Sequence, residues 1–177
     1  LWISGCNMGR ISREVMFMEM ARAASRRSTC FRLNVGALVV HENNPVAAGW
    51  NGQQPGAPHC AGNTCPGIIP GNCATTHAEV NALAKAQQLL ESADVVDLYV
   101  THSPCRECMV QIMNSHLSVR RLLFEVPYRN SDHLVTLRQP YRRRMAGLSY
   151  KRNTAVYEVT PAGYIVEYFS RRVVELP

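Results

Sequence analysis

The sequence predicts an α/β fold, a three-layer α/β/α sandwich with a central mixed sheet, and two observations carry that prediction. A hairpin pattern over residues 35–50 is followed by alternating helix and strand patterns, an order typical of a mixed sheet covered by helices on both faces. Of the 177 residues, 46 % are hydrophobic and 18 % are charged, which excludes a natively unfolded chain. No apolar run is long enough to cross a bilayer.

Four helices are predicted from apolar residues at helical spacing behind residues that favour a helix start. Ser12 is the expected N-cap of the first helix, and Thr75 or Thr76 that of the second. Ser103-Pro104 starts the third helix, and Ser131 starts the fourth, which is strongly basic. The four helices are expected over residues 12–27, 75–90, 105–115 and 131–147.

Six strands are predicted from short apolar runs bounded by turn residues. The turns Glu42-Asn43-Asn44-Pro45 and Pro161-Ala162-Gly163 each separate two such runs, so each is expected to close a hairpin. We expect one domain over residues 1–177, with a core of about residues 10–130 followed by the basic helix and hairpin of about residues 131–177. The strands are expected over residues 35–41, 46–50, 95–100, 119–125, 154–160 and 164–169.

The net charge of +6 is concentrated in the last third of the chain. Residues 1–118 contain eight basic and eight acidic residues, whereas residues 119–177 contain eleven basic and five acidic ones. Because the arginine guanidinium binds phosphate through two hydrogen bonds, this region favours an anionic partner, such as a nucleotide, a nucleic acid or the acidic face of another subunit. A solvated basic helix face is the other interpretation. The densest cluster is Arg138, Arg142, Arg143, Arg144, Lys151 and Arg152.

The seven cysteines favour metal binding over disulfides. The first residues contain no basic segment followed by a long apolar one, so we expect no secretion signal and a cytoplasmic protein. In a reducing compartment, clustered thiols more often hold a metal than pair with one another. Cys105-Arg106-Glu107-Cys108 on its own is compatible with a redox pair, a structural zinc site or half of an iron–sulfur site.

Two predicted helix starts together carry the chemistry of a hydrolytic metal site. His77 opens one helix, while Cys105 and Cys108 share a face at the start of the next. One imidazole and two thiolates neutralise Zn²⁺ and leave a fourth position for water, whose pKa zinc lowers towards ~7. Glu79 stands beside this set without being a ligand, as a proton shuttle requires. This order of His-x-Glu and Pro-Cys-x-x-Cys is the signature of zinc-dependent base deaminases.

Several segments resemble the deoxycytidylate deaminases, most closely the bacterial late-competence type and its phage relatives. The resemblance spans about residues 10–130 and implies the cytidine deaminase-like form of the α/β/α sandwich. The Gly/Cys-rich insert before His77 is not expected in tRNA adenosine deaminases. The segments are Thr29–Ala37, Gly49-Trp50-Asn51-Gly52, His59-Cys60, Cys73–Leu83 and Tyr99–Cys105.

The resemblance assigns roles to individual residues. It implies that Glu79 is the catalytic acid and base, that Asn51 contacts the deoxyribose and that Tyr128 lines the nucleotide pocket. From the residues alone, Asn51 is equally compatible with an ordinary turn at a strand end. The resemblance further implies two zinc ions. One is catalytic and is bound by His77, Cys105 and Cys108. The other is structural and is bound by Cys30, Cys60, Cys65 and Cys73, with His59 as the substitute ligand if one cysteine does not bind.

The activity implied is hydrolysis of dCMP to dUMP and ammonia, which supplies precursor for dTTP synthesis. The resemblance also implies a homo-oligomer, often a hexamer, with dCTP activating and dTTP inhibiting through a site that includes residues 52–56. Where some members carry a substrate-facing arginine, this chain has Gln87-Gln88. The phosphate would therefore be held elsewhere, with Arg26, Arg27, Arg32 and Arg129 as candidates.

Two alternatives stay open at this point. The same zinc chemistry would serve dCTP or a 5-substituted dCMP. A zinc-stabilised nucleic-acid-binding or competence accessory protein without activity is favoured by the basic C-terminal third and disfavoured by Glu79, because a structural zinc has no use for a free carboxylate beside it.

Overall fold

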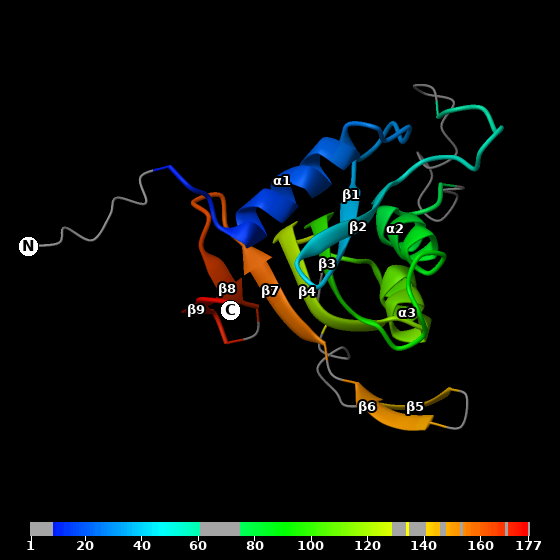
Figure 1. Cartoon of the computed structure of the whole chain (residues 1–177). Coiled ribbons are helices and arrows are strands. Elements are labelled where there is room, and N and C mark those ends of the chain that lie inside the picture. Colours follow the sequence, from blue (N-terminus) through cyan, green and yellow to red (C-terminus); the bar gives the residue numbers. More distant parts are fainter. Residues whose placement is uncertain are drawn as a thin grey trace, which may run out of the picture.

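The computed structural model contains a seven-stranded mixed sheet with helices on both faces (Figure 1). The structure describes residues 9–60, 75–128, 134, 141–145, 148–152, 154–168 and 170–176. Strand order is β2-β1-β3-β4-β7-β8-β9, and only β3–β4 and β4–β7 are parallel pairs among the described strands. The helices are α1 (Arg13–Ser25), α2 (Ala78–Ala86) and α3 (Arg106–Asn114). The strands are β1 (Gly36–His41), β2 (Asn44–Trp50), β3 (Val95–His102), β4 (Ser118–Val126), β5 (Tyr141–Met145), β6 (Leu148–Arg152), β7 (Ala155–Val159), β8 (Ile165–Glu167) and β9 (Arg172–Val174).

Alternation along the central strands creates two separate cores, one on each face of the sheet. On one face, Leu38 and Tyr99 pack with Phe17 and Met18 of α1, and the rings of Phe17 and Tyr99 lie 5.3 Å apart. On the other face, Ala37, Val39 and Leu98 belong to the core that α2 and α3 cover. The three-layer α/β/α prediction is confirmed. None of the described helices is long and apolar enough to span a membrane.

Two glycines let the helices lie directly on the sheet. A Cβ on Gly36 would overlap the backbone of α1 at Ala21, and one on Gly49 would overlap the backbone of α2 at Ala78. Gly49 belongs to the Gly-Trp-Asn-Gly segment at the end of β2. The close approach it permits brings the start of α2 to the edge of the sheet, where the site lies.

The helix starts are partly as predicted. Ser12 caps α1, its Oγ accepting from the Val15 N–H at 3.2 Å. Thr75 and Thr76 do not cap α2: His77 is the N-cap, because the Thr76 backbone pairs with Gly52 in an isolated bridge. The helix also ends at Ala86 rather than near residue 90, since the following turn closes through i→i−3 hydrogen bonds.

The predicted basic helix over residues 131–147 is wrong where the structure describes it. Residues 141–145 and 148–152 form an antiparallel ribbon of β5 and β6, with Met145 opposite Leu148. Tyr141, Met145, Leu148 and Tyr150 recur at a strand period around Ala146-Gly147, but the high helix propensity of the arginines between them favoured a helix. The other residues of the predicted helix, apart from residue 134, lie outside the described ranges.

The terminal hairpin is confirmed and has a larger role than predicted. β7 and β8 pair antiparallel, with Val159 opposite Ile165, and β9 adds a third strand that was not predicted. β7 pairs parallel with β4, with Leu122 opposite Val156. The carboxyl-terminal segment therefore extends the central sheet.

Candidate metal centre and active site

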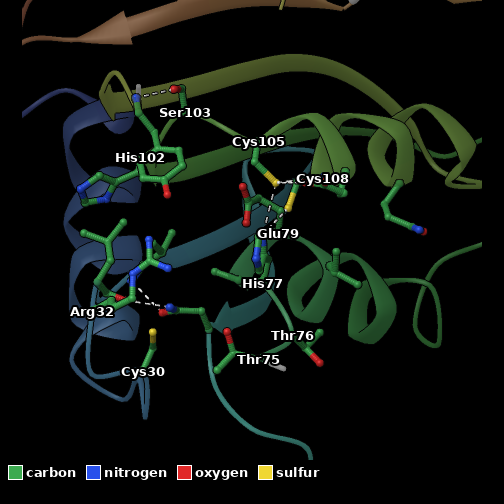
Figure 2. A pocket seen from close by; sticks show the side chains of 18 residues that line it. Cys30, Arg32, Thr75, Thr76, His77, Glu79, His102, Ser103, Cys105 and Cys108 are labelled. Carbon is green, nitrogen blue, oxygen red and sulfur yellow. Dashed lines mark hydrogen bonds between the residues drawn. The ribbon is translucent and has the colours of Figure 1, made fainter. Parts of the chain in front are cut away.

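The starts of α2 and α3 bring His77, Cys105 and Cys108 together (Figure 2). The His77 Nδ1 atom lies 3.0 Å from the Cys108 sulfur and 3.4 Å from the Cys105 sulfur. The three potential ligand atoms all lie within 4.8 Å of one another. Across the described residues, this is the one cluster of His, Cys, Asp and Glu side chains with metal-binding geometry.

Local backbone structure explains how these side chains converge. Cys105 is the N-cap of α3, and its sulfur accepts from the Cys108 N–H at 3.5 Å, so both sulfurs lie on the same side of the first turn. His77 is the N-cap of α2 but makes no side-chain capping hydrogen bond. Its imidazole is therefore directed to the sulfurs, as the sequence spacing predicted.

The donor set fits zinc. Zn–N bonds of about 2.05 Å and Zn–S bonds of about 2.3 Å at tetrahedral angles put nitrogen and sulfur about 3.5 Å apart. The two observed His77 distances need only a small expansion to reach that value. Imidazole and thiolate are also the ligands that zinc prefers, and three of them leave a fourth position open.

The two neighbouring cysteine thiols have pKa values shifted in opposite directions. The hydrogen bond from the Cys108 side chain lowers the pKa of the Cys105 thiol to about 3. The same hydrogen bond raises the pKa of Cys108, and burial raises it further. Both sulfurs bind a divalent cation as thiolates, so metal binding would release the protons that the pair holds.

Glu79 is buried beside this cluster, with 4 % of its surface exposed. Its carboxylate points to the same place as the imidazole and the sulfurs (Figure 2). Burial raises the pKa of Glu79 to about 7 against the opposing effect of its own backbone hydrogen bond. A carboxyl group with such a pKa exchanges protons readily at neutral pH, as a general acid and base must.

A cavity of about 650 Å³ opens in front of the cluster, a size typical of small-ligand sites. Asn51 and Tyr128, both predicted substrate contacts, line it, together with Arg32. The Asn51 Oδ1 accepts from Ser28 Oγ at 2.7 Å and Val35 N at 2.8 Å, and Nδ2 donates to Leu33 O at 2.7 Å. Asn51 therefore orders the loop between α1 and β1, which carries Arg32, and its remaining N–H can face a ligand.

Sequence reasoning assigned no role to two further residues, His102 and Ser103, which also line the cavity. Ser103 Oγ accepts from the Tyr128 N–H at 2.8 Å and so positions that tyrosine. Burial lowers the pKa of His102, which keeps its imidazole neutral. The signal was available: both follow the apolar run of β3, and ligands bind at the carboxyl ends of strands in such sheets.

The second predicted zinc site is only partly within the described residues. Cys30 is buried and lines the cavity on the side away from Cys105 and Cys108 (Figure 2). Cys60 accepts a hydrogen bond from Gln53 Nε2 at 3.3 Å. Cys65 and Cys73 lie outside the described ranges, so this four-cysteine site stays a prediction.

A family model described as the cytidine and deoxycytidylate deaminase zinc-binding region matches residues 11–125, which include the three residues of the cluster and Glu79. The chain belongs to this family. Its resemblance to the deoxycytidylate deaminases is confirmed at this level.

Individual relatives agree with the family. The ComE operon protein 2 of Bacillus subtilis is 39 % identical over 109 residues, 61 % of this chain and 57 % of that protein. The deoxycytidylate deaminase of Schizosaccharomyces pombe is 33 % identical over 141 residues, 75 % of this chain and 43 % of that protein. The chain thus spans about half the length of these two relatives. A crystal structure of the dCMP deaminase of cyanophage S-TIM5, in complex with dCMP and dUMP, superimposes with a TM-score of 0.57 at 31 % identity, covering 71 % of this chain and 91 % of that one.

Proposed function

We propose that this chain hydrolyses dCMP to dUMP and ammonia. The observation that carries the proposal is the His77-Cys105-Cys108 cluster with the buried Glu79 carboxyl beside it, at the end of a cavity large enough for a nucleotide. The phage enzyme that superimposes on this chain is a dCMP deaminase and was crystallised with dCMP and dUMP, which supports the same substrate here.

His77, Cys105 and Cys108 would hold the catalytic zinc, which supplies Lewis acidity that lowers the pKa of water to about 7. Glu79 takes the proton that water loses and delivers it to N3 of the cytosine ring. Addition of the water oxygen at C4 is followed by cleavage of the C4–N4 bond. Glu79 then takes the proton of the C4 hydroxyl and passes it to the departing amine, which leaves as ammonia while C4 becomes the carbonyl of the uracil ring.

Binding of the nucleotide would fall to the cavity wall opposite the sulfurs. We assign the phosphate to Arg32, because it is the one arginine or lysine among the described residues that line the cavity. Arg26 and Arg27 do not line it, and the Arg27 guanidinium lies over the Trp50 ring at 5.9 Å instead. The remaining N–H of Asn51 suits a deoxyribose hydroxyl, and Tyr128 would contact the nucleotide.

Substrate comparison tests the proposal. Ammonia release and the change in ultraviolet absorbance are followed with dCMP, dCTP, CMP and deoxycytidine. We expect dCMP to turn over fastest. If none of the four compounds reacts with the zinc-loaded protein, the proposal fails; if dCTP reacts fastest, the substrate assignment fails but the reaction class stands.

Further expectations from the family belong to this proposal. We propose a structural zinc on Cys30, Cys60, Cys65 and Cys73, a cytoplasmic homo-oligomer, and regulation by dCTP and dTTP. Elemental analysis distinguishes the zinc hypotheses, because two zinc ions per chain support both sites and one ion contradicts the second. Cys105→Ser should then lower the content by one ion, and Cys60→Ser by the other.

A further inference from the structure

The two ends of the cavity offer a ligand different chemistry. His77, Cys105 and Cys108 form the metal cluster at one end, and His102 and Arg32 lie toward the other (Figure 2). Among the described residues that line the cavity, only His77, Arg32 and His102 can carry a positive charge. Because His77 belongs to the metal cluster, Arg32 and His102 are the two side chains left to bind an anionic group of a ligand.

His102 is held in its place by the sheet. It is the last residue of β3 and lies opposite Val126 of β4 in the parallel register. The next residue, Ser103, donates its backbone N–H to the Val126 carbonyl at 2.9 Å, which continues the pairing past the end of the strand. The imidazole is therefore positioned by a rigid strand end, at the edge of the sheet where ligands of α/β proteins bind.

One ring nitrogen of His102 is engaged within the protein. Nδ1 lies 3.2 Å from the Thr101 hydroxyl, which itself accepts a hydrogen bond from the Gly36 N–H at 3.1 Å. The hydrogen of that hydroxyl can therefore be donated to Nδ1. Since burial lowers the pKa of His102, the imidazole is neutral at neutral pH and has one proton, which this arrangement places on Nε2. Nε2 is then the atom that can donate to a ligand in the cavity.

A carboxylate on β4 does not prevent an anion from binding beside His102. The negative charge of Glu125 acts on His102 and raises its pKa, against the larger effect of burial. Both oxygens of Glu125 accept hydrogen bonds at 2.9 Å from Arg22 Nε of α1. This ion pair compensates the charge of the carboxylate, so an anion near His102 would not meet an unpaired negative charge.

We propose that His102 binds the phosphate of dCMP together with Arg32. The inference rests on the proposed function, because it concerns how the deamination cavity holds its substrate. A phosphate monoester has three terminal oxygens that accept hydrogen bonds, and a guanidinium can bind two of them. Nε2 of His102 can donate to the third. His102 is thus a specificity-determining residue, which lets the cavity favour the nucleoside monophosphate over the nucleoside.

Equilibrium binding to a zinc-loaded protein that cannot turn over its ligand tests this inference. In Glu79→Gln, the dissociation constants of dCMP and deoxycytidine are measured by calorimetry with and without a second substitution, His102→Phe. Phenylalanine keeps a ring but has no N–H donor. It should weaken dCMP binding by at least about tenfold, the loss expected for one hydrogen bond to a charged group, and leave deoxycytidine binding unchanged. His116→Phe is the matched control, because His116 is also half-buried but does not line the cavity.

A direct readout is the NMR signal of the His102 ring proton on Cε1, between the two nitrogens. The signal is assigned by its loss in His102→Gln. It should shift further when dCMP is added to the Glu79→Gln protein than when deoxycytidine is added. Thermal melting checks that each variant keeps its fold. If His102→Phe melts early, this shift decides the question, because a signal that both ligands move equally contradicts a phosphate contact.

Three binding results would also overturn the inference. They are an unchanged affinity for dCMP in His102→Phe, equal losses for dCMP and deoxycytidine, and equal losses in His102→Phe and His116→Phe. Failure of the proposed function gives a different result. Binding of dCMP that depends on His102, in a parent protein that releases no ammonia, contradicts the deamination alone. Release of ammonia from dCMP, with normal dCMP binding in His102→Phe, contradicts this inference alone.

Discussion

The part of the chain that the family model covers and the part that follows it differ in how they use charge. Residues 11–125 contain nine basic and nine acidic residues, and a buried ion pair joins β3 to β4. Asp97 on β3, 3 % exposed, accepts from Arg121 of β4 at 2.5 Å and from Arg120 at 2.9 Å. Residues 126–177 contain nine basic and four acidic residues.

Charged residues therefore have different roles in the two regions. In the first region the buried Arg121 pairs with Asp97, and the buried Glu79 carboxyl lies beside the metal cluster. In the second, β7 to β9 extend the sheet, while β5 and β6 carry unbalanced charge away from it. Substitutions in the first region should affect turnover and stability, and those in the ribbon should leave both nearly unchanged.

The largest effect is expected at Glu79. Glutamine keeps the shape of the Glu79 side chain but cannot transfer a proton. In Glu79→Gln, kcat for dCMP should therefore fall by about 10²–10⁴-fold. Zinc content should stay unchanged, since Glu79 is not one of the clustered ligands. Glu14→Gln is the matched control: Glu14 is also buried but lies on α1, on the other face of the sheet. Near-normal turnover by Glu79→Gln would refute the assignment.

The next effect concerns the stability of the sheet beneath the cavity. Asp97→Asn leaves the buried Arg121 guanidinium without its counter-charge, which should lower the free energy of unfolding by about 3–5 kcal/mol in denaturant titrations. Glu175→Gln, at an exposed position, should change it by less than about 0.5 kcal/mol. If Asp97→Asn changed the free energy of unfolding as little as Glu175→Gln does, the pair would not stabilise the fold.

The same pair predicts a pH dependence. Burial alone would raise the pKa of Asp97, but hydrogen bonds from Arg121 and Arg120 outweigh it and hold the pKa below its usual value. The stabilisation is therefore fully present above the unfolded pKa of about 3.9 and is lost as pH falls through the lower folded pKa. The stability gap between parent and Asp97→Asn should stay constant from neutral pH to about 5 and narrow only below about 4. A gap that closes near neutral pH would contradict this.

Features that depend on local sequence could be predicted, whereas features that depend on tertiary contacts could not. The metal cluster was predictable because His77 and Cys105 each start a helix, and local spacing directs their side chains. The sequence alone did not identify Arg32 or His102 among their neighbours as residues that line the cavity. A tertiary contact through Asn51 orders the loop that carries Arg32, and the position of His102 depends on where β3 ends. β5 lies within the segment that was predicted as a basic helix, where arginine favours a helix, and no element was predicted over β6.

A smaller and more selective effect is expected at Arg32. Loss of a charge-assisted hydrogen bond to phosphate, worth about 1.5–3 kcal/mol, should raise KM for dCMP by about 10- to 100-fold in Arg32→Gln. Turnover of deoxycytidine, which has no phosphate, should not change. Arg26→Gln removes an exposed arginine that does not line the cavity and serves as the control. Equal losses for both substrates would indicate a general disturbance of the loop rather than a phosphate contact.

The smallest effect is expected for substitutions in the β5–β6 ribbon. Arg142→Gln/Arg144→Gln/Lys151→Gln changes three residues of a two-stranded sheet that does not pair with the central sheet. The free energy of unfolding should therefore stay within about 0.5 kcal/mol of the parent, and kcat and KM for dCMP should not change. A large loss of turnover would mean that the ribbon belongs to the active site, and the separation of the two regions would fail.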